Sequence, residues 1–147
     1  MQINANYFGN VSYEANEPIH IINGLIGFES YTEYLPIPFH EDNDSLISLQ
    51  SLEDETLSFI LMNPFGIFPD YAPTLSRQDM DELKAESSDD ISYYVISVIR
   101  DSVAESTVNL KAPLIVNALN RQAKQIILEH TDYTFRHALG EMMKEER

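Results

Sequence analysis

The apolar residues of this chain fall in short runs separated by turn-forming residues, a pattern typical of β-structure. The segment 91–99 is β-branched and aromatic on both faces, which predicts a central strand in the core. We find no internal repeat and no low-complexity tract. The pattern therefore predicts a mainly β domain with strands at 3–13, 18–22, 35–39, 46–51, 57–63, 91–100, 109–118 and 124–130.

Two short peripheral helices interrupt the predicted strands. The first begins at Ser76, whose hydroxyl can cap free amides, and Asp79 favours the positive end of a helix. Met80 and Leu83 supply its buried face. Between two apolar runs, Asn23 and Gly24 predict a tight turn, because both residues tolerate positive φ angles.

The second predicted helix runs from about Asp132 towards the C-terminus. Its apolar residues are Phe135, Leu139 and Met142 or Met143, which recur at helical spacing. The charged residues 144–147 follow. We therefore divide the chain into a β domain at 1–139 and a charged helical tail at 140–147.

Length and composition fit one globular domain. The chain has 147 residues, of which 44% are hydrophobic and 22% are charged. It contains no Cys, which fits a reducing compartment. The N-terminus lacks the basic segment and apolar stretch of a secretory signal, and no apolar run approaches the roughly 18 residues of a membrane helix. These features predict a cytoplasmic protein that does not enter a membrane.

Charge is unevenly distributed along the chain. The formal net charge is -15, and no Lys or Arg precedes Arg77, although Asp and Glu are frequent there. Such an acidic half would repel a phosphate backbone, so direct binding to nucleic acid is disfavoured. It would attract a basic protein partner, although acidity can also serve solubility alone.

Motifs for catalysis and cofactor binding are missing from the sequence. The five glycines form no phosphate-binding loop or dinucleotide fingerprint, and no G-x-S-x-G elbow occurs. The four histidines lack the spacing of metal ligands, and the acidic segment 40–44 lacks the glycine and the distal Glu of a calcium loop. We expect no enzymatic activity, no cofactor and no metal.

Two segments have compositions that are typical neither of a buried core strand nor of a solvent-exposed loop. Segment 63–73 combines three prolines with three aromatic residues, so it either plugs the edge of the core or forms a partner-binding patch. In segment 109–117, Pro113 cannot donate a ladder hydrogen bond. We expect 109–113 to form an irregular sheet edge, where another chain could add a strand.

These segments resemble the FliW flagellar assembly factors, and the resemblance extends in order along most of the chain. The matched elements are the opening strand 3–9, the Gly-x-x-Gly-Phe-Glu turn at 24–29, Leu49-Gln50-Ser51, Asn63 to Tyr71, the Asn-Leu-x-Ala-Pro segment at 109–117, Asn120 with Lys124 and Gln125, and the closing Tyr133, Arg136, His137 and Leu139. Departures occur too: Ala138 stands where the family usually has Pro, which would permit the second helix.

The resemblance implies a small β-barrel-like protein without catalytic activity that binds flagellin and the translational repressor CsrA, a small basic RNA-binding dimer. Free FliW would hold CsrA off the flagellin message, and accumulating flagellin would take FliW away and release CsrA. Our candidate partner-binding residues are Phe65, Phe68, Asp70, Tyr71, Asn109, Leu110, Lys111 and Pro113. Two other hypotheses stay open: a small barrel that binds or processes a small molecule, and a purely structural subunit.

Overall fold

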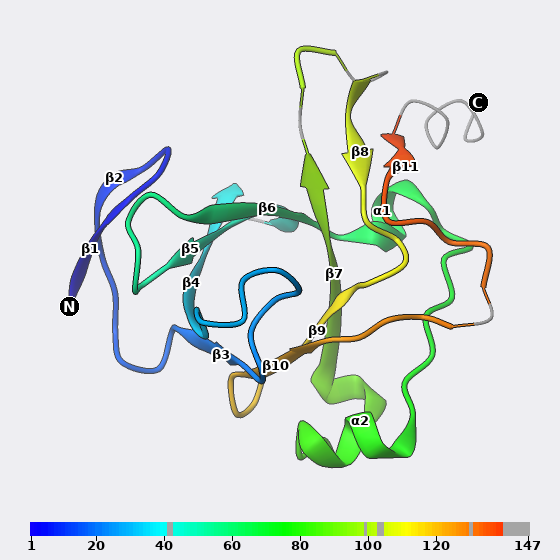
Figure 1. Cartoon of the computed structure of the whole chain (residues 1–147). Helices are drawn as coiled ribbons and strands as arrows, with labels where there is room; N and C mark the ends of the chain where they lie inside the picture. The colour runs from blue at the N-terminus through cyan, green and yellow to red at the C-terminus, as the bar shows by residue number, and fades with distance from the viewer. Residues whose placement is uncertain (41–42, 99, 103–104, 130, 140–147) are drawn as a thin grey trace.

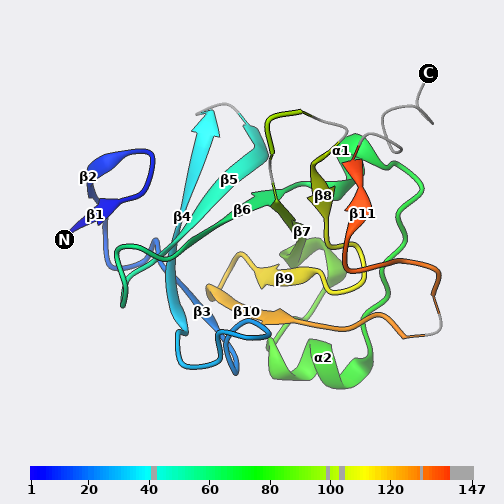
Figure 2. The ribbon, with the colours of Figure 1, turned by 45° about the horizontal axis from the view of Figure 1, so that its top comes forward.

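Seven strands close into a small barrel in the computed structural model, which describes residues 1–40, 43–98, 100–102, 105–129 and 131–139 (Figures 1 and 2). The strand order is β7-β6-β5-β4-β3-β10-β9, and β9 pairs back with β7. Among the strands of the described residues, β3 and β10 form the single parallel pair, and the other pairs are antiparallel. The strands are β3 (Ile19–Ile21), β4 (Glu33–His40), β5 (Asn43–Ser51), β6 (Ser58–Met62), β7 (Ile91–Val98), β9 (Leu114–Asn117) and β10 (Gln122–Gln125). The mainly β prediction is confirmed.

Two apolar clusters stabilise the barrel. One fills its interior with side chains from most of its strands, among them Ile21, Leu49 and Leu114, which are fully buried. The other lies between β7, β9 and the segments outside the barrel, and it includes Leu83, Val95 and Leu110. As predicted, β7 is a central strand, because it pairs with β6, with β9 and with the short strand β8 (Thr107–Val108). Burial of each such aliphatic side chain contributes roughly 1.5 to 3 kcal/mol.

The N-terminal segment is a hairpin and not the single strand predicted at 3–13. The chain reverses between β1 (Gln2–Ala5) and β2 (Gly9–Ser12), where Tyr7 has φ 72° and Gly9 has φ 67°. The hairpin lies at one side of the barrel, where Ile3 and Ala5 pack with Leu35 of β4 (Figure 1). The turn was missed because Tyr7 is not a usual turn residue.

The predicted first helix is confirmed as α2 (Arg77–Glu82). The Ser76 hydroxyl accepts a hydrogen bond from the Asp79 amide at 3.0 Å, and the Asp79 carboxylate accepts one from the Ser76 amide at 3.3 Å. At the other end, the Leu83 carbonyl accepts hydrogen bonds from the side-chain amides of Asn117 and Asn120, both at 2.9 Å. Both helix ends are therefore satisfied, and the second end is held to the β9–β10 turn.

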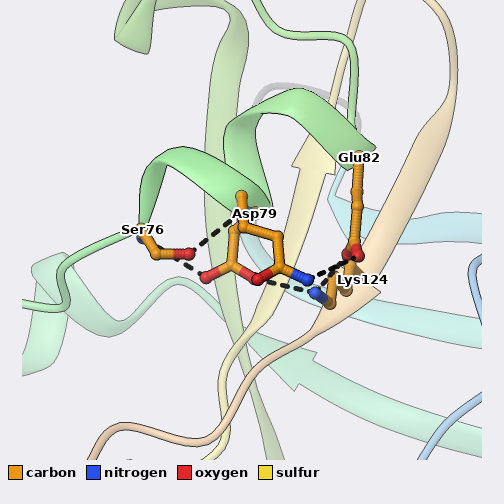
Figure 3. Close-up of polar contacts among 5 residues, drawn as sticks. Ser76, Asp79, Glu82 and Lys124 are labelled. Carbon is orange, nitrogen blue, oxygen red and sulfur yellow. Dashed lines mark hydrogen bonds and ion pairs between the residues drawn. The ribbon is translucent and has the colours of Figure 1, made fainter.

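Lys124 of β10 ties α2 to the barrel through two carboxylates (Figure 3). Its ammonium group lies 2.7 Å from Asp79 and also pairs with Glu82. Partial burial alone would raise the pKa of Asp79, but hydrogen bonds from Lys124 and Ser76 outweigh it and hold the pKa below its usual range. Partial burial alone would lower the pKa of Lys124. The hydrogen bonds and charges of Asp79 and Glu82 outweigh this effect, so the pKa of Lys124 is raised.

Replacing Lys124 with Met should lower the free energy of unfolding by about 1 to 2 kcal/mol at neutral pH, because Asp79 then keeps a partly buried charge without its partner. The lowered pKa of Asp79 means that its stabilisation is present above the ordinary Asp pKa and is lost as the pH falls through the folded pKa. The difference in the free energy of unfolding between wild type and variant should therefore shrink between pH 7 and pH 2.5.

Urea melts at both pH values measure this difference. Lys84→Met is the control for the loss of one positive charge. A difference that is equal at both pH values would contradict the role of the pair.

The predicted strand 109–118 is wrong as one element. Only β9 (Leu114–Asn117) and the preceding β8 (Thr107–Val108) are strands, and residues 109–113 form a bend between them. The Asn109 side chain accepts a hydrogen bond from the Ala112 amide at 3.0 Å, which stabilises this bend next to Pro113. The strand predicted at 124–130 is likewise shorter, since β10 ends at Gln125.

The second helix predicted from Asp132 is also wrong over residues 132–138. The chain there makes a turn and then β11 (His137–Ala138), which pairs with β8. Tertiary hydrogen bonds decide this, because the Thr134 carbonyl accepts from the amides of Leu110 and Lys111, both at 3.1 Å. Leu139 is buried as expected, but Phe135 is 52% exposed. The predicted tail at 140–147 lies outside the described residues.

Candidate partner-binding surface

Asn63 shapes the segment that follows β6. Its side chain caps the one-turn helix α1 (Pro64–Ile67) by accepting a hydrogen bond from the Phe65 amide at 3.0 Å. Pro64 occupies the first helical turn, where it needs no amide hydrogen. The segment thus begins with an ordered helical turn, which the sequence analysis did not predict.

The three aromatic residues of this segment differ in exposure. Tyr71 is 3% exposed and lies in the core, Phe68 is half-buried, and Phe65 is 40% exposed. Asp70 is exposed. The core-plug interpretation therefore holds for Tyr71, and binding of a partner by the exposed side chains of this segment stays a prediction.

Tyr71 joins the two segments singled out in the sequence. Its hydroxyl donates a buried hydrogen bond of 2.7 Å to the Leu110 carbonyl. Burial, with Tyr133 and Tyr93 close by, raises the pKa of Tyr71, so the hydroxyl stays protonated and remains a donor. Segments 63–73 and 109–113 are therefore parts of one structure.

An aromatic cluster surrounds this contact, and three of its members were not among the candidate residues. Tyr133 packs edge to face on Tyr71 with ring centroids 4.8 Å apart, and its hydroxyl accepts a hydrogen bond from the Ala72 amide at 3.0 Å. His137 stacks on Phe68 at 6.1 Å, and Tyr93 contacts Phe65 at 5.7 Å. We call Phe65, Phe68, Tyr71, Tyr93, Tyr133 and His137 the aromatic cluster. The closing Tyr-x-x-Arg-His motif was the signal for two of these residues.

The segment 109–113 is not an open sheet edge, so that prediction is wrong. Its amides and carbonyls bond within the chain: the Asn109 amide donates to Ile96, the Lys111 carbonyl accepts from Leu128, and the Pro113 carbonyl accepts from Ile126. Leu110 and Pro113 are buried, whereas Asn109 and Lys111 are half-buried. Most of the backbone groups that strand addition would need are thus already bonded within the chain. Tyr71, Leu110 and Pro113 could influence a partner only through the neighbours that they position.

Comparison with known proteins gives one consistent result. The model of the FliW protein family matches residues 2–139. This chain belongs to the FliW family. Flagellar assembly factor FliW of Shouchella clausii is 36% identical over 136 residues, covering 92% of each chain. The FliW of an Exiguobacterium species is 35% identical over 147 residues and covers all of both chains.

A solved structure supports the same family at the level of the fold. The crystal structure of a flagellar assembly factor FliW superposes with a TM-score of 0.87 at 29% identity, covering 95% of this chain and 96% of that one. The match confirms the FliW-like β-barrel. Within the described ranges, none of the helices has the length and apolar content of a membrane span.

Proposed function

We propose that this protein is a flagellar assembly factor that binds flagellin and the translational repressor CsrA. Membership of the FliW family over nearly the whole chain carries the proposal, because the relatives bear the name flagellar assembly factor. By the partner switch described above, the free protein antagonises CsrA so that flagellin is translated, and it acts in the cytoplasm without catalysing a reaction.

The distribution of charge supports a basic partner. The residues before Arg77, which include no Lys or Arg, form the β1–β2 hairpin, four barrel strands and α1. In Figure 1, the hairpin and these strands make up one side of the molecule. An acidic side attracts a basic repressor and repels the phosphates of a message.

A small-molecule site inside the barrel finds little support. The cavity inside the barrel, lined by residues such as Ile19, Leu61 and Tyr94, has a volume of about 90 Å³. Ligand pockets usually measure roughly 300 to 1,000 Å³. The interior is thus too small for a typical metabolite.

Electrostatic steering of CsrA towards the acidic side can be tested through the salt dependence of the association rate. The association rate with purified CsrA should fall by about tenfold between low salt and roughly 0.5 M salt, because screening shortens the reach of the acidic side. Stopped-flow or surface-capture kinetics across a salt series measures this rate. A rate that stays flat would remove steering from the mechanism, and absence of binding to both CsrA and flagellin would contradict the proposed function itself.

A further inference from the structure

A groove of about 710 Å³ separates the N-terminal hairpin from the barrel. Tyr13 lies on the hairpin side, and Glu33 of β4 and Glu53 lie on the barrel side. Leu119, from the turn between β9 and β10, also lines the groove. None of these residues belongs to the aromatic cluster, so the groove is a separate feature of the surface.

Apolar side chains line much of this groove without being covered by the chain. Met1 is 72% exposed and Leu119 is 78% exposed, while Tyr13 and Leu52 are half-buried. Large apolar groups gathered in a concave surface suit contact with another molecule better than contact with water.

Two carboxylates in the groove are held in place by the chain. One oxygen of Glu53 accepts hydrogen bonds from the amides of Thr32 at 2.8 Å and Glu33 at 3.0 Å. One oxygen of Glu33 lies 2.6 Å from Nδ1 of His20. These contacts use one oxygen of each carboxylate, and a carboxylate accepts hydrogen bonds through both. Each group is therefore oriented in advance for a donor from outside.

The chain compensates the charge of these two carboxylates only in part, through His20, which pairs with Glu33 when it is protonated. In the described part of the chain, neither Glu33 nor Glu53 forms an ion pair with Lys or Arg. Arg121 also lines the groove and keeps its charge there, and its guanidinium donates to the backbone carbonyl of Glu17 and not to either carboxylate. A guanidinium or ammonium group from a partner would supply the missing donors.

We infer that the groove binds a basic segment of a protein partner, with a Lys or Arg side chain placed between Glu33 and Glu53. The methylene stem of that side chain packs on Tyr13 and Leu52, where cation–π attraction to Tyr13 adds to the binding. The inference rests on the proposed function, whose basic partner is the repressor, and it assigns that partner to this groove and not to the aromatic cluster.

The test compares two variants with the same change in net charge. Glu33→Gln with Glu53→Gln removes both carboxylates of the groove but keeps oxygen acceptors for the amides of residues 32 and 33. Glu86→Gln with Glu129→Gln changes two exposed residues that do not line the groove. Affinity for purified CsrA and for purified flagellin is measured by surface capture on the full chain, and urea melts confirm folding.

We expect the groove variant to bind CsrA at least tenfold more weakly and the control variant to change less than twofold. Flagellin should bind both variants like wild type. Equal affinity of the two variants for CsrA would overturn the groove assignment while leaving the proposed function intact. Loss of flagellin binding in place of CsrA binding would overturn the assigned occupant. Failure of wild type to bind CsrA would overturn the repressor-binding part of the proposed function together with the inference.

Discussion

Replacing Gly24 with Ala should destabilise the fold by about 3 kcal/mol or more, because two costs add at this position. Gly24 has φ +70°, a conformation that residues with a Cβ adopt only under strain. A Cβ there would also lie 2.7 Å from the Cα of Glu29 and 2.9 Å from the carbonyl oxygen of Phe28. Both neighbours are backbone atoms, so relief requires movement of the whole turn.

Gly27 provides a matched control in the same turn. It has φ +87°, but a Cβ built there meets nothing within 4 Å. Gly27→Ala therefore carries the conformational cost alone, about 1 kcal/mol. Urea melts of both variants and of wild type give the two free energies of unfolding. Equal losses at the two positions would show that close packing at Gly24 contributes nothing.

Elements whose causes are local could be predicted from the sequence. The start of α2 depends on Ser76 and Asp79, three residues apart, and the structure has both reciprocal hydrogen bonds of the capping box. The turn at Asn23 and Gly24 follows from two residues that tolerate positive φ, and both have it. Strand β4 and its partners β5 and β6 were placed from short apolar runs separated by turn residues.

Elements that depend on distant partners could not be predicted. Residues 132–138 carry apolar residues at helical spacing, yet the Thr134 carbonyl binds amides of residues 110 and 111. The bend at 109–113 likewise depends on hydrogen bonds to residues 96, 126 and 128. Because these bonds join segments that are separate in sequence, periodicity in one segment carries no information about them.

The candidate site was located in part. Composition marked the aromatic segment 63–73, but it could not separate Tyr71, which is 3% exposed, from Phe65, which is 40% exposed. That difference arises from α1 and from the hydrogen bond to the Leu110 carbonyl, both of which need the folded chain. Which of these side chains touch a partner remains a prediction.

Tyr71→Ala should cost about 3 to 5 kcal/mol of stability, since it removes a buried ring and leaves the Leu110 carbonyl without its donor. Tyr71→Phe separates the two contributions: it keeps the ring and should cost about 1 to 2 kcal/mol. Urea melts measure both changes. Equal stability of Tyr71→Phe and wild type would show that the 2.7 Å hydrogen bond does not stabilise the fold.

Phe65→Ala should behave in the opposite way, with a loss of about 1 kcal/mol in stability and a loss of tenfold or more in affinity for flagellin. Phe65 is 40% exposed, so its ring still offers apolar area to a partner, while its contacts with Tyr71 and Tyr93 hold it in place.

Tyr7→Ala is the control for Phe65→Ala, because Tyr7 is an exposed aromatic residue on the distant hairpin. Binding to flagellin and to CsrA is measured on each folded variant. If Phe65→Ala binds both partners as tightly as wild type, the aromatic cluster serves the core alone, and flagellin must contact another surface.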